Sequence, residues 1–214
     1  MKARQYLEDV RKEVEPLKVE ILRCPFLTKA ERGEMTVNQL CTFVENLLYM
    51  VPHDARSYIL MASRANDPEE AKYFAELALG ELEAFEALKE MADELDIGLR
   101  PLHEMRIIPH VIDYTHFLAF LATHRNPGEQ VFALLVDFPV WSAACSKLFS
   151  ALKNMNVIRN VKFLELFSDI PGWIEERGLH ICERYVERYG DNMRLFALLM
   201  EKYELGFWKG LLEG

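Results

Sequence analysis

The sequence predicts an all-α fold, and two observations lead to this prediction. Apolar residues recur at helical spacing through almost the whole chain. Alternating, strand-like runs are missing from the sequence, and its Gly and Pro residues fall mainly between the periodic segments. No repeat of fixed period and no long linker divides the 214 residues. We therefore expect a single domain over residues 1–214, a bundle of eight or nine helices.

Each predicted helix corresponds to one periodic run. Turn residues such as "RANDPEE", "DIGLRP" and "HRNPGEQ" separate the runs. In chain order the predicted helices cover about 3–15, a short segment up to 23–27, 37–65, 68–95, 109–125, 127–154, 160–167, 171–190 and 191–212.

Three of these helices begin with a recognisable cap. Thr36 precedes the helix over 37–65, and its hydroxyl can accept a hydrogen bond from the first turn. Asp67 is followed by Pro68, which suits the first helical position. Asn126, with Glu129 three residues later, is typical of a capping box.

Composition narrows the class of protein. The net charge of −9 and the absence of a Lys/Arg-rich block argue against a nucleic-acid partner. No run of 18 apolar residues predicts a membrane span, and the charged N-terminal segment does not look like a signal peptide. The four cysteines are far apart and form no CxxC pair, which favours the reducing cytoplasm.

Four acids fall on apolar helix faces, one on each of four long helices. Glu204, for example, shares a stripe with Met200 and Phe207. A buried charge is costly unless it is paired, protonated or functional. A single acid of this kind can lie at the edge of an apolar stripe or pair with a buried Arg. Four such acids on four long helices predict a common pocket between the helices. The four acids are Asp54, Glu81, Asp137 and Glu204.

The sequence does not predict a metal site or another cofactor. Di-iron helical bundles use Glu-x-x-His pairs, and the chain has none. His180 lies on a charged helix face that is typical of a solvated surface. Cys41 and Cys145 lack a neighbouring His that would activate a thiol, and we interpret them as packing residues.

Five segments, in this order, resemble the TenA family. The most specific of them is the Glu-x-x-Phe-Trp sequence at 204–208. TenA shares the haem-oxygenase-like all-α fold with PqqC, so the resemblance implies that fold for nearly the whole chain. TenA proteins of the thiaminase II type hydrolyse thiamin or its breakdown aminopyrimidines. The five segments are 24–44, 81–98, 114–122, 132–141 and 201–208.

The resemblance also implies roles for particular residues. Glu204 matches the interior catalytic glutamate of the family, Glu81 its interior acid, and Tyr114 a pocket tyrosine. Asp137 stands where the nucleophilic cysteine is expected, and Leu47 where an aspartate grips the pyrimidine. The chain therefore resembles the family in its proton-carrying glutamate and departs from it in the nucleophile and in the gripping acid.

The residues at hand suggest substitutes for these missing groups. Asp54 lies two turns after Leu47 on the same helix face and could grip a cationic or amidine-like ligand. Asp137 could act as a base for water or as a weak nucleophile. The chain also offers aromatic residues to stack on a flat ring, namely Tyr58, Tyr114 and Trp141.

Three functional interpretations remain open from the sequence. The first is a thiaminase II-like aminohydrolase that acts on a small, flat, nitrogen-rich or cationic molecule. The second is a binding or regulatory protein that kept the pocket and lost the chemistry. The third is a PqqC-like oxidase without a cofactor, which the "VPHDA" segment at 51–55 faintly resembles. Surplus aromatic residues, together with the family resemblance, predict a homodimer or homotetramer.

Overall fold

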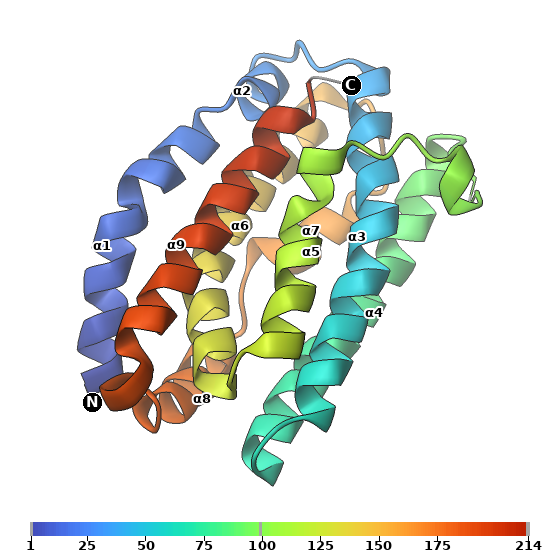
Figure 1. The fold of residues 1–214 in the computed structure, drawn as a ribbon. Coiled ribbons are helices and arrows are strands. Elements are labelled where there is room, and N and C mark those ends of the chain that lie inside the picture. The colour runs from blue at the N-terminus through green and yellow to red at the C-terminus, as the bar shows by residue number, and fades with distance from the viewer. Residues whose placement is uncertain (1, 99, 213–214) are drawn as a thin grey trace.

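The computed structural model describes residues 2–98 and 100–212, which form nine α-helices, a short 3₁₀ turn and no strand (Figure 1). The all-α prediction is confirmed. The helices are α1 (Lys2–Leu22), α2 (Pro25–Glu31), α3 (Val37–Ser63), α4 (Pro68–Glu94), α5 (Pro109–His124), α6 (Pro127–Met155), α7 (Lys162–Ser168), α8 (Gly172–Glu183) and α9 (Val186–Gly210), and the 3₁₀ turn covers Leu102–Glu104.

The six long helices run side by side along the length of the molecule (Figure 1). α3 packs along α4 and α5, and α9 packs against α1, α5 and α6. α6 also contacts α1, α2, α7 and α8, so it occupies the centre of the bundle. Side chains that point inward from several long helices therefore meet near α6 and α9.

Helix α6 is long and apolar enough, by length and composition, to cross a membrane. However, 61% of its most apolar window is buried inside the bundle. A helix that is apolar nearly all round is expected at the centre of a large helical core. We therefore interpret α6 as the core helix of the fold.

The predicted caps are present. The Thr36 side chain accepts from the Gln39 backbone N–H, and the Gln39 side chain accepts from the Thr36 backbone N–H, which completes a capping box. Asn126 and Glu129 form the same arrangement at α6. Asp67 accepts hydrogen bonds from the first-turn N–H groups of α4. These local signals fix where the helices begin.

The predicted bounds of the first two helices are wrong. The first helix does not stop at residue 15 but continues through Pro16 to Leu22, and α2 follows at Pro25. An interior Pro removes one helical hydrogen bond and costs about 3 kcal/mol in isolation. Buried Val14 and Ile21, on either side of Pro16, hold both halves of α1 against the bundle.

The predicted break at residues 190 and 191 is also wrong. The chain turns at Arg184 and Tyr185, and α9 runs uninterrupted through Gly190. The guanidinium of Arg184 and the hydroxyl of Tyr185 both bind the buried carboxylate of Glu70, at 3.0 and 2.7 Å. The Tyr185 side chain also lies against Gly128, where a Cβ would clash at 2.3 Å. These tertiary contacts therefore determine where α8 ends and α9 begins.

The apolar core has two clusters of buried side chains, and Tyr114 of α5 packs against both. One cluster surrounds Trp208 and Phe43, and the other surrounds Phe132 and Tyr73. Residues of both clusters line the candidate site.

Candidate functional site

One cavity brings together all seven side chains singled out in the sequence. Asp54 and Tyr58 reach it from α3, Glu81 from α4, Tyr114 from α5, and Glu204 from α9. The space in this cavity that the centre of a water-sized sphere can occupy is about 50 Å³, so the cavity is small as it stands. Asp137 and Trp141 of α6 complete the seven, and the other lining residues are Leu47, Met50, Val51, Phe138, Phe163 and Phe167.

Helical periodicity explains the pairing of acids with aromatic residues in this lining. Asp54 and Tyr58 are four residues apart on α3, as are Asp137 and Trp141 on α6, so each pair faces the same direction. The lining also includes no His, so the proximal ligand of many haem proteins has no counterpart among the described lining residues.

Asp54 is almost completely buried at the cavity wall. The hydroxyl of Thr115 on α5 donates a hydrogen bond to its carboxylate. Burial raises the pKa of Asp54 well above its usual value, and the nearby carboxylates of Glu81 and Asp137 raise it further. Thr115 was not predicted to be a site residue, because a single hydroxyl residue next to Tyr114 does not stand out in the helical spacing of apolar residues.

Asp137, which is buried, and Glu81, which is partly buried, also have raised pKa values, because contact of both carboxyl groups with bulk water is reduced. Burial raises the pKa of Asp137 to about 7, and a hydrogen bond from the Tyr114 hydroxyl, at 2.7 Å, offsets part of that effect. Burial raises the pKa of Glu81 to about 8. Both carboxyl groups are therefore able to exchange protons near neutral pH.

Glu204 is 1% exposed and lies on the apolar face of α9, as its spacing predicted. The indole N–H of Trp208 donates to Oε1 of Glu204 at 3.1 Å. Burial raises the pKa of Glu204 well above its usual value, and the charges on Asp137 and Glu201 add to the shift. Its surroundings thus favour the neutral form of Glu204.

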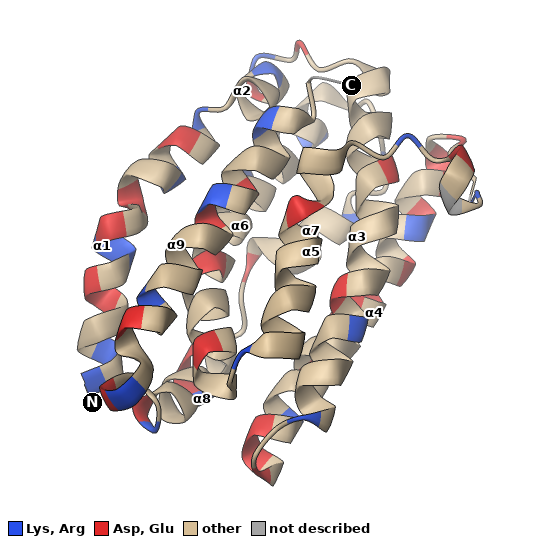
Figure 2. Cartoon of the chain, in the orientation of Figure 1, with Lys and Arg blue, Asp and Glu red and all other residues tan. Residues whose placement is uncertain are grey.

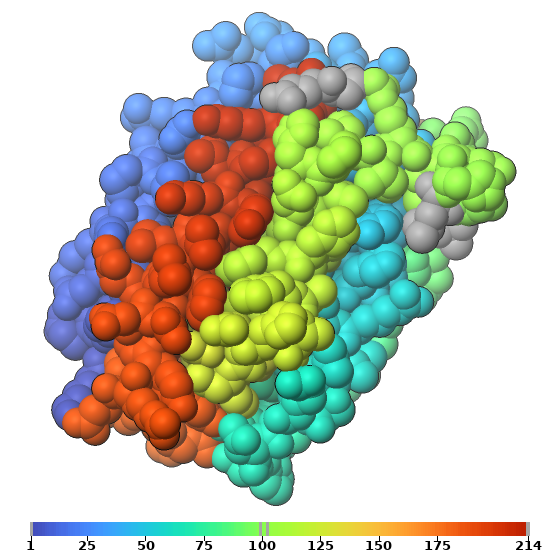
Figure 3. Space-filling view, viewed as in Figure 1, coloured from blue at the N-terminus to red at the C-terminus, as the bar shows by residue number. Residues whose placement is uncertain are grey.

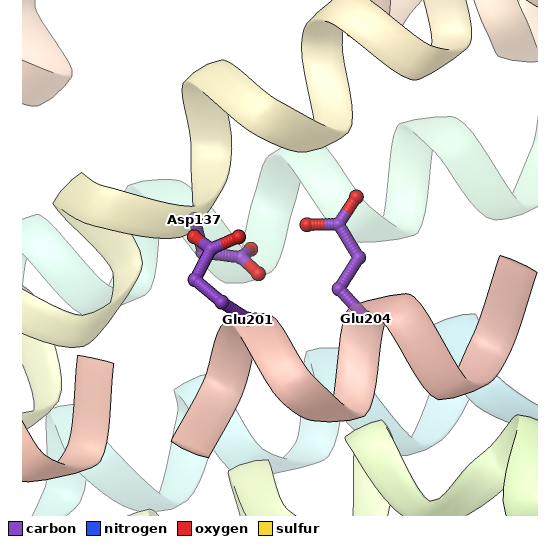
Figure 4. Close-up of side chains that lie close together, drawn as sticks. All are labelled: Asp137, Glu201 and Glu204. Atoms are coloured by element: carbon purple, nitrogen blue, oxygen red, sulfur yellow. The ribbon is translucent and has the colours of Figure 1, made fainter. Parts of the chain in front are cut away.

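Sequence reasoning missed Glu201, which lies one turn before Glu204 on α9 (Figure 4). Glu201 is completely buried. One oxygen each of Asp137, Glu201 and Glu204 lies within 4.8 Å of the others. The signal was present, because Glu201 is four residues after buried Ala197 and so falls on the same apolar stripe.

These three carboxyl groups are close enough to hold a metal ion. The prediction that the protein needs no metal rested on histidine spacing, and it did not consider a site made only of carboxylates. Hard divalent cations take six or more oxygen ligands. The cluster offers three carboxyl groups, and two of them already accept hydrogen bonds from Tyr114 and Trp208.

A second hollow adjoins the cavity and is larger, with about 210 Å³ that the centre of a water-sized sphere can occupy. It extends between α4, α6 and the connection from α7 to α8, where Trp173 and Pro171 form part of its wall. The lining residues that the two spaces share are Tyr58, Glu81, Phe138, Trp141 and Phe167.

Solved structures share this architecture. A TenA homologue from P. horikoshii OT3 aligns with a TM-score of 0.79 at 20% identity, covering 97% of this chain and 98% of that one. A TenA family transcription regulator from Silicibacter sp. TM1040 aligns at 0.77 and 13% identity, over 96% of both chains. A candidate TenA-like thiaminase from Sulfolobus solfataricus P2 aligns at 0.69 and 14% identity, again over 96% of both. At these identities the likeness concerns the fold, which is the predicted haem-oxygenase-like bundle.

No curated protein matches the chain. The family model of the TENA/THI-4/PQQC family, in contrast, matches residues 11–206, which include every residue of the cavity lining. The predicted resemblance is confirmed, and this chain belongs to the TENA/THI-4/PQQC family.

Proposed function

We propose that this protein binds a small, flat, nitrogen-rich cation of the aminopyrimidine or thiamin-related class and hydrolyses it. One observation carries the proposal. The inner cavity combines four carboxyl groups with aromatic walls, and no Lys, Arg or His is among the residues described in its lining. The four acids are Asp54, Glu81, Asp137 and Glu204.

Such a lining favours a cation over a neutral or anionic ligand. Four neighbouring carboxyl groups without a basic partner favour their neutral forms while the cavity is empty, because burial and then the nearby charges oppose ionisation. A protonated amidine edge or a ring cation supplies the missing positive charge. Trp141 and Tyr114 offer ring faces that stack on a flat cation.

Asp54 is suited to grip the ligand in place of the acid that the family carries at the position of Leu47. Both residues line the cavity, seven residues apart on α3. Thr115 holds the Asp54 carboxylate at the cavity wall. This geometry supports a displaced contact between Asp54 and an aminopyrimidine edge.

Asp137 and Glu204 supply the proton transfers of hydrolysis. Asp137 as carboxylate accepts a proton from water, whose oxygen forms a bond to the methylene carbon of the substrate. The carbon–nitrogen bond breaks, its electron pair stays on the leaving amine, and Glu204 donates its proton to that nitrogen. The two groups exchange protonation states, and solvent restores both. Different pKa shifts on two neighbouring acids are typical of such acid and base pairs.

Ligand binding should therefore release protons. We expect thiamin or an aminomethyl-pyrimidine to bind more tightly as pH rises from about 6 to 8, because the cation favours the ionised carboxylates. Calorimetry in buffers of different ionisation enthalpy measures the protons released. Asp54→Asn should weaken binding by about tenfold or more, and the surface variant Glu86→Gln should leave it unchanged.

Product analysis by chromatography tests the hydrolysis itself. Release of the hydroxymethyl-pyrimidine product supports the proposal, whereas binding that is independent of pH contradicts the role given to the carboxyl groups. Tight, proton-linked binding without any product would favour the second candidate, a ligand-binding or regulatory protein. The Asp at position 137 is the observation that favours this candidate, because the family nucleophile is missing there.

Self-association is expected through the face formed by α5 and α9, which is turned toward the viewer in Figure 3. Asp113 is the only Lys, Arg, Asp or Glu residue within α5, and the rest of this helix is tan in Figure 2. Phe120 is 38% exposed on this face and borders a shallow hollow with Phe196 and Tyr203. Exposed apolar patches of this kind are typical of interfaces.

Light scattering at micromolar concentration should give the mass of a dimer or tetramer. Phe120→Glu should shift the population to monomer, while Ile59→Glu, at a more exposed apolar position on α3, serves as the control. A monomeric wild-type protein would refute the prediction of assembly. Dissociation caused by Ile59→Glu instead would move the interface to α3.

A further inference from the structure

Most of the free space at the site lies in the second hollow, between α4, α6 and the connection from α7 to α8, which we call the outer hollow. The centre of a water-sized sphere can occupy about 210 Å³ there, against about 50 Å³ in the inner cavity. The two spaces adjoin, because they share lining residues such as Glu81 and Trp141. A ligand whose first ring fills the inner cavity therefore has to extend its remaining part into the outer hollow.

Aromatic side chains form much of the wall of the outer hollow. Phe138, Trp141 and Phe167 line it, and each is only half-buried. Trp173 of α8 is a half-buried lining residue too, and the guanidinium of Arg177 lies 4.9 Å from the centre of its ring. Partly exposed rings gain free energy when a flat apolar or cationic group covers them.

The charged residues in the wall of the outer hollow are acids. No Lys, Arg or His is among its described lining residues. Arg177 lies nearby, but its guanidinium is ion-paired with Glu76. A negatively charged group in the hollow would lie beside carboxylates without a free basic partner, whereas a positive charge would be attracted. The four acids of the lining are Glu76, Glu81, Glu83 and Asp169, and the last two are exposed.

Gly80 keeps one wall of the outer hollow open. It lies on α4 one turn after Glu76 and one turn before Ala84, and all three residues line the hollow. A side chain at position 80 would therefore point into this space. Beyond its chain neighbours and its own helix backbone, a Cβ there would meet no atom within 4 Å. Packing thus does not require glycine here, although glycine is unfavourable inside a helix, and the missing side chain leaves room for a ligand.

We propose that the outer hollow is a second subsite, which selects the substituent that a ligand carries beyond its first ring. It takes a flat, neutral or positively charged substituent and disfavours a phosphorylated one. The inference rests on the proposed function, because the first ring of the ligand has to occupy the inner cavity. Gly80 provides the space, the aromatic wall provides the contact area, and Glu83 and Asp169 oppose a negative charge.

Filling the hollow at position 80 tests the space. Gly80→Leu should weaken the binding of thiamin, whose second ring is a thiazolium cation, about tenfold or more. The aminomethyl-pyrimidine has no second ring, so its affinity should stay within about twofold of the wild-type value. Ala75→Leu adds the same side chain at an exposed position of α4 outside the hollow, and it should change neither affinity. Equilibrium titration calorimetry measures both ligands.

A phosphate on the second ring tests the charge. The wild type should bind thiamin monophosphate about tenfold or more weakly than thiamin. Glu83→Gln combined with Asp169→Asn should reduce this ratio about three- to tenfold. Glu8→Gln combined with Glu187→Gln removes the same charge from exposed positions of α1 and α9, and it serves as the control. The wild-type comparison needs no variant, so it decides the question if Gly80→Leu does not fold.

The outcomes separate this inference from the proposed function. Thiamin binding that Gly80→Leu leaves unchanged, or a loss shared equally by the aminomethyl-pyrimidine, would overturn the second subsite and leave the proposed function intact. A monophosphate that binds as tightly as thiamin would do the same. Binding with the expected pattern but without hydrolysis would support the subsite and contradict the proposed reaction. If neither thiamin nor the aminomethyl-pyrimidine binds to the wild type, both proposals are wrong.

Discussion

Glu204→Gln is expected to lower turnover about 10²–10⁴-fold, the range typical of general acid–base groups, while the protein stays folded and still binds its ligand. Glutamine has almost the same shape as glutamate and can still accept a hydrogen bond from the Trp208 indole. It cannot donate a proton to a leaving nitrogen. The loss should therefore appear in kcat, with a small change in KM.

The measurement is single-turnover hydrolysis of the substrate that shows product release, with circular dichroism to confirm the fold. Asp137→Asn in the same assay tests the base, and a comparable loss would support its role in accepting the proton from water. Glu86→Gln, a surface carboxylate paired with Lys89, is the matched control. Full activity of Glu204→Gln would contradict the central role given to this residue.

The second large effect is a loss of stability with rising pH. Several buried carboxyl groups have pKa values above those of the unfolded chain, with Asp137 at about 7 and Glu81 at about 8. Between about pH 4.5 and 8 the folded protein holds protons that the unfolded chain has already released. Stability is therefore greatest at the acidic end of this window and falls as pH rises through the folded pKa values.

Each such group contributes at most about 1.4 kcal/mol per pH unit. Asp137 and Glu81 together set an upper limit of about 5 kcal/mol between pH 5.5 and 8.5, so we expect the melting temperature to fall by up to about 10–20 °C, given 2–4 °C per kcal/mol for a domain of this size. Acids with lowered pKa, such as Asp67 and Glu183, lose their contribution only below this window. Calorimetric scans across the range, with Glu201→Gln alongside, measure the slope.

Glu201→Gln should flatten the decline, because it removes a group whose ionisation the folded state resists. A bound cation should flatten it too. A melting temperature that is constant or rises from pH 5.5 to 8.5 would mean that the cavity acids are already ionised in the folded protein, which would refute the protonation states inferred above.

Local chemistry in the sequence determined much of the fold. Thr36, Asp67 and Asn126 marked helix starts correctly, because a cap is an interaction between residues two or three apart. Helical periodicity also placed Asp54, Glu81, Asp137 and Glu204 on inward faces, and the structure finds all four around one cavity. Periodicity assigns a side chain to a face without reference to any other helix.

Only the tertiary structure decided the rest. Helix α1 continues through Pro16 because both of its halves pack on the bundle, and α9 begins at Val186 because Glu70 holds the preceding turn. The Tyr114–Asp137 bond and the approach of Glu201 to Asp137 join α6 to α5 and α9. The position of a residue in the helical repeat gives the direction of its side chain, but it does not identify the group that the side chain meets. The pKa of each carboxyl group depends on that neighbouring group and on how far packing excludes water from it.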